Sequence, residues 1–308
     1  MFGLLSLVWG SSFLLIKIGV SDPQINAFTL VSARLGSAAV AFAITLIVLR
    51  KKVPQDAKTL LSLVAVGIIN TAIPFVLITS GEQTIDSGLA GVLNGTVPLF
   101  SFVIAHVALT DDKMNTRKLF GLIAGFAGVV MLALQGSSAG HTSNPLLGQL
   151  EVLIAAVSYA FAAVLIRRNL RHVDPLMTAG GSLIVGAITV IVVTLVTGQV
   201  LPNLAALQSG TLPAILWLGL INTFVAYILY FTLIANWGAS RATLVTYTMP
   251  PTSLLLGVLF EGERPGLLVL LGALLIVGGV VLANLRKPSP KAPISRIETV
   301  EPELVPEV

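Results

Sequence analysis

Ten stretches of about 20 mostly apolar residues, joined by short polar loops, constrain this chain more than any other feature. A helix needs about 20 apolar residues to cross a bilayer. Only 10% of the 308 residues are charged, whereas soluble domains carry about 25%. The sequence therefore predicts an all-α integral membrane protein with ten transmembrane helices. The stretches lie near residues 2–20, 26–49, 59–80, 87–109, 117–135, 146–167, 175–197, 212–235, 240–260 and 266–285.

The positive charges are distributed unevenly among the connections between these stretches. Of the 18 lysines and arginines, 15 lie in the loops after the second, fourth, sixth and eighth stretches or in the C-terminal tail. Loops rich in lysine and arginine stay on the cytoplasmic side of a membrane. The pattern predicts that both termini are cytoplasmic. It also assigns Asp22, Glu82, Asp86, Glu261 and Glu263 to loops on the opposite face.

The sequence contains a repeat with a period of 152 residues. Residues 67–98 align without a gap to residues 219–250, and eight of the 32 positions are identical. A half of the molecule therefore appears twice. Each half holds five spans, an odd number, so the second half must enter the membrane inverted. Inverted repeats are typical of secondary transporters, whose substrate sites lie near the bilayer midplane. The identical pairs include Asn70/Asn222, Thr71/Thr223, Thr96/Thr248 and Pro98/Pro250.

The repeat divides the chain into three parts. We expect a first five-helix repeat over residues 1–136 and a second, inverted one over residues 145–287. Residues 288–308 contain five prolines and four glutamates. Such a composition cannot bury a core, so this segment is predicted to be a disordered cytoplasmic tail.

Prolines inside the predicted spans mark candidate hinges. Pro98, Pro250 and Pro251 each remove a backbone donor and free carbonyl groups within an apolar segment. Broken helices expose backbone to substrate in many transporters. A simple packing kink is the alternative interpretation, although Pro98 and Pro250 occupy equivalent positions in the two repeats.

Polar and aromatic side chains within the spans are candidates for a substrate site. An unpartnered amide in a wholly apolar medium costs on the order of 4–8 kcal/mol, so each must face protein or a wet cavity. Hydrogen bonds between helices, or burial of an aromatic ring with a satisfied hydroxyl, would account for the same residues. The substrate-binding candidates are Trp9, Ser12, Asn70, Asn94, Tyr159, Asn222, Tyr227 and Tyr247.

Few charges lie inside the predicted spans. Arg34 lies well within the second span, where an arginine costs about 2.5–3.5 kcal/mol on insertion scales. It is a functional candidate, although pairing with backbone carbonyls would also explain it. Glu151 is the only carboxylate within a span, so coupling to protons would have to use Glu151, His106 or the charge of the substrate. Lys17 is close enough to the outer surface to snorkel.

Several classes of function are excluded by what the sequence lacks. There is no cysteine, and the three histidines show no metal-ligand spacing, so we predict no metal site and no cofactor. A phosphate-binding Gly-x-x-x-x-Gly-Lys-Ser/Thr motif is absent, which excludes an ATP-driven pump. No pair of residues resembles a catalytic dyad within the spans, so an enzyme is not predicted. The glycines of the fifth and tenth spans are interpreted as close helix packing.

With these features placed, residues 1–285 resemble the EamA-type ten-helix branch of the drug/metabolite transporter (DMT) superfamily. The resemblance is carried by Trp9-Gly10-Ser11-Ser12-Phe13 with Lys17, by Arg34, and by Thr96-Val97-Pro98 with its counterpart Thr248-Met249-Pro250-Pro251. It implies a central cavity lined by helices 1, 3, 4, 6, 8 and 9. It also implies export of amino acids or related metabolites by alternating access. One departure is Asp111-Asp112, where the family usually has a glutamate.

We therefore predict a multi-pass inner-membrane secondary transporter that exports small metabolites by alternating access. Amino acids or related compounds are the expected substrates. Transport of other metabolites, of nucleotide-type or drug-like solutes, and a passive membrane channel are the alternatives. The expected partners are a small-molecule substrate and the lipid bilayer, and no nucleic acid. A monomer is the expected oligomeric state.

Overall fold

The computed structural model describes residues 1–110, 113–134, 145–199, 207–237 and 243–284. Within these ranges every regular element is helical. The predicted tail, residues 288–308, lies outside the described residues, as do Asp111 and Asp112.

The first repeat contains five spans, two of which are built from more than one helical segment. The third span passes through a π-helical turn, and the fourth is broken in its middle. Its elements are α1 (Phe2–Val20), α2 (Ala27–Val48), α3 (Ala57–Gly67), η1 (Ile68–Ala72), α4 (Ile73–Gly81), α5 (Ser87–Asn94), α6 (Val97–Ala108) and α7 (Thr116–Leu134).

The second repeat follows the same order of spans. Its third span again passes through a π-helical turn, and its fourth begins with a 3-10 turn before the α-helix. Its elements are α8 (Leu146–Leu165), η2 (Ile166–Leu170), α9 (Pro175–Val196), α10 (Thr211–Gly219), η4 (Leu220–Val225), α11 (Ala226–Trp237), η5 (Thr243–Thr248), α13 (Met249–Phe260) and α14 (Leu267–Asn284).

The described residues confirm the prediction of ten helices. Nine helical segments are long and apolar enough to cross a membrane, and the shorter apolar segment Leu244–Phe260 supplies the tenth. Large apolar side chains stay exposed on the outward faces of these helices, for example Ile47, Leu259 and Leu274. In water such a surface would be unstable, whereas a bilayer solvates it.

Polar residues fix where several of these helices begin. The side chains of Asn26 and Asp56 accept hydrogen bonds from the backbone N–H of the third residue beyond. The Asp174 carboxylate accepts from two backbone N–H groups, and Pro175 occupies the first position of α9. These caps satisfy donors that a helix leaves unpaired at its start.

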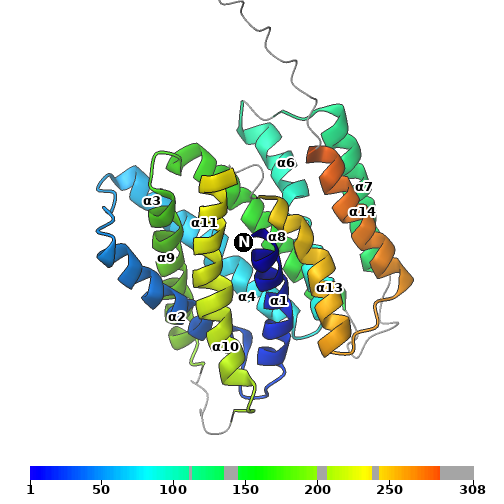
Figure 1. Cartoon of the computed structure of the whole chain (residues 1–308), viewed down its shortest axis with the longest axis horizontal. Helices are drawn as coiled ribbons and strands as arrows, with labels where there is room; N and C mark the ends of the chain where they lie inside the picture. Colours follow the sequence, from blue (N-terminus) through cyan, green and yellow to red (C-terminus); the bar gives the residue numbers. More distant parts are fainter. Residues whose placement is uncertain (111–112, 135–144, 200–206, 238–242, 285–308) are drawn as a thin grey trace, which may run out of the picture.

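Helices α1 and α14 run in opposite directions: α1 runs down from the N-terminus near the middle of the view, and α14 runs up and ends near the top (Figure 1). The loops after α2 and after η2 meet, because Lys51 Nζ donates to Asp174 Oδ2 at 2.6 Å. The loops predicted to be cytoplasmic from their positive charges are therefore neighbours in space.

Glycines allow α7 and α14 to pack backbone against backbone at one edge of the bundle (Figure 1). A Cβ atom added to Gly128 would lie 2.6 Å from the carbonyl oxygen of Gly272, and one added to Gly121 would collide with the carbonyl oxygen of Gly279. The predicted close packing of these glycines is present. Gly278, by contrast, has open space beside it.

The helical irregularities recur at equivalent positions of the two repeats. The π-helical turns η1 and η4 start 152 residues apart, at Ile68 and Leu220. Pro74 follows η1, but Ala226 takes its place after η4. Proline is therefore not what the two turns have in common. A π-helical turn often marks a functional position, and here each carries the shared asparagine.

Candidate functional site

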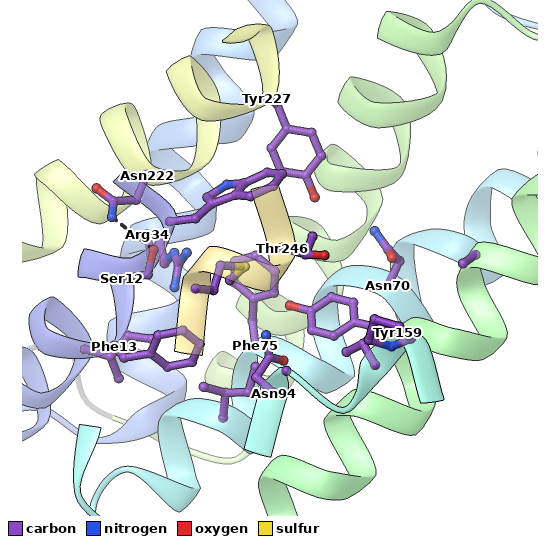
Figure 2. Close-up of a pocket in the computed structure, with 18 residues that line it drawn as sticks. Ser12, Phe13, Arg34, Asn70, Phe75, Asn94, Tyr159, Asn222, Tyr227 and Thr246 are labelled. Atoms are coloured by element: carbon purple, nitrogen blue, oxygen red, sulfur yellow. Dashed lines mark hydrogen bonds between the residues drawn. The ribbon is translucent and has the colours of Figure 1, made fainter. Parts of the chain in front are cut away.

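A cavity of about 310 Å³ lies where the two repeats meet. Side chains from α1, η1 with α4, α5 with α6, α8, η4 with α11, and η5 with α13 line it. These are helices 1, 3, 4, 6, 8 and 9 of the chain, the set that the family resemblance implied. Helix 2 adds Arg34. Figure 2 shows the side chains converging from these elements on one space.

Arg34 is the charged residue of the cavity wall. Its side chain is buried, and its Nε donates to Thr223 Oγ1 at 3.1 Å. The guanidinium carbon lies 4.5 Å from the centre of the Phe75 ring, a cation–π contact. Thr223 in turn donates to the Leu218 carbonyl oxygen within the π-helical region. The guanidinium is thus held in place from two sides while it borders the cavity.

Asn222 and Asn70 both line the cavity but are held differently. The Asn222 amide nitrogen contacts the Val8 carbonyl oxygen and lies 3.1 Å from Ser11 Oγ and 3.0 Å from Ser12 Oγ. Asn222 therefore joins η4 to α1, as the alternative interpretation expected (Figure 2), and it is also part of the cavity lining. Asn70 is half-buried and interacts with Tyr227 across the boundary between the repeats.

Asn94 lies at the break in the fourth span. Helix α5 ends at Asn94 and α6 begins at Val97, so Gly95 and Thr96 interrupt the span. The Asn94 Oδ1 atom is buried and accepts no hydrogen bond among the described residues. An unsatisfied acceptor of this kind costs about 1–3 kcal/mol, and a solute that donates to it would recover that free energy.

The hinge prolines lie at helix starts and not in the middle of continuous helices. Pro98 is in the first turn of α6, and Pro250 is in the first turn of α13. Proline is tolerated there because the N–H it lacks would have no partner in the helix. Pro98 lines the cavity. Pro250 packs on Gly95, where an added Cβ would lie 2.6 Å from Pro250 Cγ, so the two helix breaks touch.

Aromatic rings form much of the remaining wall. The Tyr159 and Tyr227 rings enter the cavity from α8 and α11 (Figure 2). Trp9 lies against Tyr230 with ring centres 5.1 Å apart, so one edge of its indole packs in the protein and the other borders the cavity. Phe13 and Phe75 complete an apolar surface beside the amides.

Of the predicted site residues, seven substrate candidates and Arg34 line this cavity and four other residues do not. Tyr247, Pro251 and Glu151 are not part of the lining, and Pro250 reaches it only through Gly95. The Glu151 carboxylate instead accepts a hydrogen bond of 3.1 Å from Ser80 Oγ. The seven are Trp9, Ser12, Asn70, Asn94, Tyr159, Asn222 and Tyr227.

Several lining residues were not predicted from the sequence. Phe75 and Ile78 lie five and eight residues after Asn70, a spacing that does not fit one face of an α-helix, and the π-helical turn η1 brings them to the same cavity. Thr246 and Met249 belong to the irregular start of the ninth span, for which periodicity gives no signal. Among the described residues, no group of three metal-binding side chains occurs.

These observations define a membrane protein with a central, mostly apolar cavity that carries a few polar groups and lies between its two repeats. A profile of the EamA-like transporter family matches residues 1–134 and 146–285. The chain therefore belongs to the EamA-like transporter family, within the DMT superfamily. It is a transporter and not an enzyme.

Relatives cover nearly the whole chain. The uncharacterised inner membrane transporter YedA of Escherichia coli (strain K12) is 30% identical over 288 residues, which are 92% of this chain and 89% of YedA. The uncharacterised transporter YoaV of Bacillus subtilis (strain 168) is 28% identical over 284 residues, 92% of this chain and 95% of YoaV. The prediction of a multi-pass inner-membrane transporter is confirmed.

One crystal structure shares this fold with a TM-score of 0.61 and 18% sequence identity, covering 91% of this chain and 98% of the other. At that identity the likeness concerns the fold alone.

Proposed function

We propose that the central cavity is the substrate site of a secondary transporter for amino acids and closely related carboxylate-bearing metabolites, which it exports by alternating access. Arg34 carries this proposal. Among the described residues that line the cavity it is the only one with a formal charge. A buried cation without a paired carboxylate in the wall favours a solute that brings its own negative group.

The geometry at Arg34 suits a carboxylate. Its Nε is engaged by Thr223, which fixes the plane of the guanidinium. The two terminal nitrogens can then donate in parallel to two carboxylate oxygens, the arrangement that makes arginine selective for carboxylates and phosphates. A nucleotide-type solute, with two or more negative charges, would lack a second cation in this wall.

Acceptors elsewhere in the cavity suit an ammonium group. Asn94 Oδ1 is buried without a partner. The hydroxyl oxygens of Tyr159 and Tyr227 can accept further hydrogen bonds, and a cation is also attracted by their ring faces. A zwitterion therefore finds a cation for its carboxylate and neutral acceptors for its amine.

The rest of the cavity favours a small solute with an apolar side chain. Small-molecule pockets span on the order of 300–1,000 Å³, and this cavity of about 310 Å³ is at the low end. Its aromatic wall offers an apolar surface on which an aliphatic or aromatic side chain would pack. The size argues for single metabolites over larger drug-like molecules.

The paired helix breaks support alternating access. The interruptions at Thr96 and Thr248 lie 152 residues apart and meet through the contact of Gly95 with Pro250. Equivalent breaks in inverted repeats allow one repeat to open as the other closes. Export is the direction that the family resemblance implies, and a single chain with both repeats suffices for this cycle. A passive channel would not need matched hinges.

The test is a flux panel with the full-length protein in lipid vesicles. We expect uptake or counterflow of apolar amino acids and weak transport of their amides, which lack the carboxylate. Arg34→Gln should reduce amino-acid flux at least about tenfold, the effect of losing about 1.4 kcal/mol, and should abolish the preference for acid over amide. The matched control is Arg171→Gln in an exposed cytoplasmic loop, which should leave flux unchanged. Equal transport by the wild type and Arg34→Gln would refute the proposal.

A further inference from the structure

Glu82 lies in the loop between α4 and α5, but its carboxylate does not have the exposed environment expected of a loop residue. It directly follows α4, yet its side chain is fully buried. Neither of its carboxylate oxygens has a hydrogen-bond partner among the described residues. A buried ionised carboxylate without partners is far more costly than a neutral acid. The sequence had placed Glu82 among exposed charges of the outer face.

Two other carboxylates at this end of the molecule, Glu263 and Asp22, accept several hydrogen bonds. Glu263 accepts from the backbone N–H and hydroxyl of Ser87, both at 2.6 Å, and from the backbone N–H of Gly88 at 3.0 Å. Asp22 accepts from Gln208 N at 2.8 Å and Thr211 Oγ1 at 2.7 Å. Glu263 thereby binds the first N–H groups of α5, and Asp22 joins the loop after α1 to the start of α10. Glu82 has no such structural role to explain its burial.

The charged groups that face Glu82 come from three other elements. Burial raises the pKa of the Glu82 carboxyl well above its ordinary value. Lys17 on α1 and Arg34 on α2 oppose this rise, whereas Glu263 in the loop after α13 adds to it. Helix α8, which packs on α4, presents Glu151, whose carboxylate is engaged by Ser80.

Lys17 does not neutralise Glu82 in a direct ion pair. Its Nζ donates to the backbone carbonyl oxygens of Glu82 and Ile85, at 2.8 and 2.9 Å. The ammonium therefore holds the loop between α4 and α5, and the carboxylate is left within range of two cations but bonded to neither.

This site borders the substrate cavity. Ile78, one helical turn before Glu82, lines the cavity, and so does Ile16, the neighbour of Lys17. Arg34, which lines the cavity, interacts electrostatically with Glu82. A change of charge at Glu82 would therefore change the electrostatic potential at Arg34, where the carboxylate of a solute would bind.

We propose that Glu82 is a proton-binding site that couples this transporter to a proton gradient, and this inference rests on the proposed function. In the buried arrangement the carboxylate holds one proton. The proton is taken up when the cavity opens to the outer side and leaves to water when the cavity opens to the cytoplasm, where the resulting anion is stabilised by Lys17 and Arg34. One proton is bound and one is released in each cycle, and no bond between heavy atoms changes.

The first test follows the protonation of Glu82 directly and needs no substrate. Infrared spectra of the full-length protein in lipid should show the carbonyl stretch of a buried carboxylic acid at neutral pH. The band should disappear as pH rises through the raised pKa, because the acid then ionises. It should be missing in Glu82→Gln and present in Glu151→Gln. A neutral-pH band that persists in Glu82→Gln would assign the proton elsewhere and overturn the proposal.

The second test measures coupling with any amino acid that is transported in the flux panel. At one proton per solute, each pH unit of gradient drives up to about tenfold accumulation. Glu82→Gln should lose this accumulation and keep solute exchange at equal pH, whereas Glu151→Gln should keep both. Gradient-driven accumulation by Glu82→Gln at the wild-type level contradicts the proposal. If no amino acid moves in the wild type, the proposed function fails, and the infrared titration still decides whether Glu82 holds a proton.

Discussion

The two repeats share the irregular backbone of their third and fourth spans, but three charges of the first repeat are unmatched in the second. Both carry a π-helical turn with an asparagine and a helix break with a threonine, at positions 152 residues apart. Lys17, Arg34 and Glu82 belong to the first repeat, and their counterparts in the second are Asn169, Gly186 and Ile234. The comparison separates two requirements. Matched backbone geometry suits a motion that exchanges the roles of the halves, whereas unmatched charges make the two faces chemically different.

Even the asparagines that the two repeats share, Asn70 and Asn222, make different contacts. The Asn222 amide is engaged by three acceptors of α1. The equivalent interface of the other repeat uses Ser158 Oγ, which donates to the Ile69 carbonyl oxygen at 2.5 Å. Helix 1 of each repeat is thus attached to the π-helical turn of the other repeat, with the donor on opposite partners. Asn70 is thereby left to face the cavity and Tyr227.

The largest effect on stability should come from the glycine contact shared by α7 and α14. Gly279→Ala should lower the free energy of unfolding by about 1–3 kcal/mol, because the new methyl group would collide with the Gly121 carbonyl oxygen. The neighbouring Gly278→Ala is the matched control, since nothing lies within 4 Å of the position. Unfolding in mixed micelles measures both. Equal stability of the two variants would contradict backbone-to-backbone packing of these helices.

A smaller, unequal effect is expected at the repeated asparagines. Asn222→Leu should cost about 1–2 kcal/mol of stability, because the amide hydrogen bonds that join η4 to α1 are lost in a buried site. Asn70→Leu should cost less, since the side chain is only half-buried, and should chiefly reduce flux. Thermal unfolding and vesicle transport, measured on the same preparations, separate the two outcomes. Similar losses of stability at both positions would show that the repeats use the asparagine in the same way.

The smallest effect should be equal in both repeats. Thr96 Oγ1 donates to the Leu93 carbonyl oxygen at 2.6 Å, and Thr248 Oγ1 donates to the Val245 carbonyl oxygen at 2.7 Å. Each bond satisfies a carbonyl group at a helix break. Thr96→Val and Thr248→Val should each cost about 0.5–1 kcal/mol in unfolding experiments. A markedly larger cost at one threonine would mean that only one break depends on its hydroxyl.

The number of helices was predictable because the thickness of the bilayer sets the length of each apolar span. Apolar runs of bilayer length can only be spans, and the break of the fourth span was marked by Pro98. The sequence could not show that Lys17 reaches the carbonyl groups after α4, or that the following Glu82 is buried. Both depend on contacts between segments 65 and 68 residues apart. Tyr247 does not line the cavity, and the 3-10 turn η5 interrupts the helical periodicity from which its direction could have been predicted.

What the sequence alone determined is the membrane fold, the doubling of the chain and the inversion of its halves. These follow from the length of the apolar stretches, from the placement of the charges and from the odd number of spans in a repeat. None of them depends on which residues are in contact in the folded protein. The tertiary structure decided which polar groups meet. It directed Arg34 to the cavity, tied Asn222 to α1 and left the Glu82 carboxylate buried without a partner, because the environment of a side chain is set by residues far away in the chain.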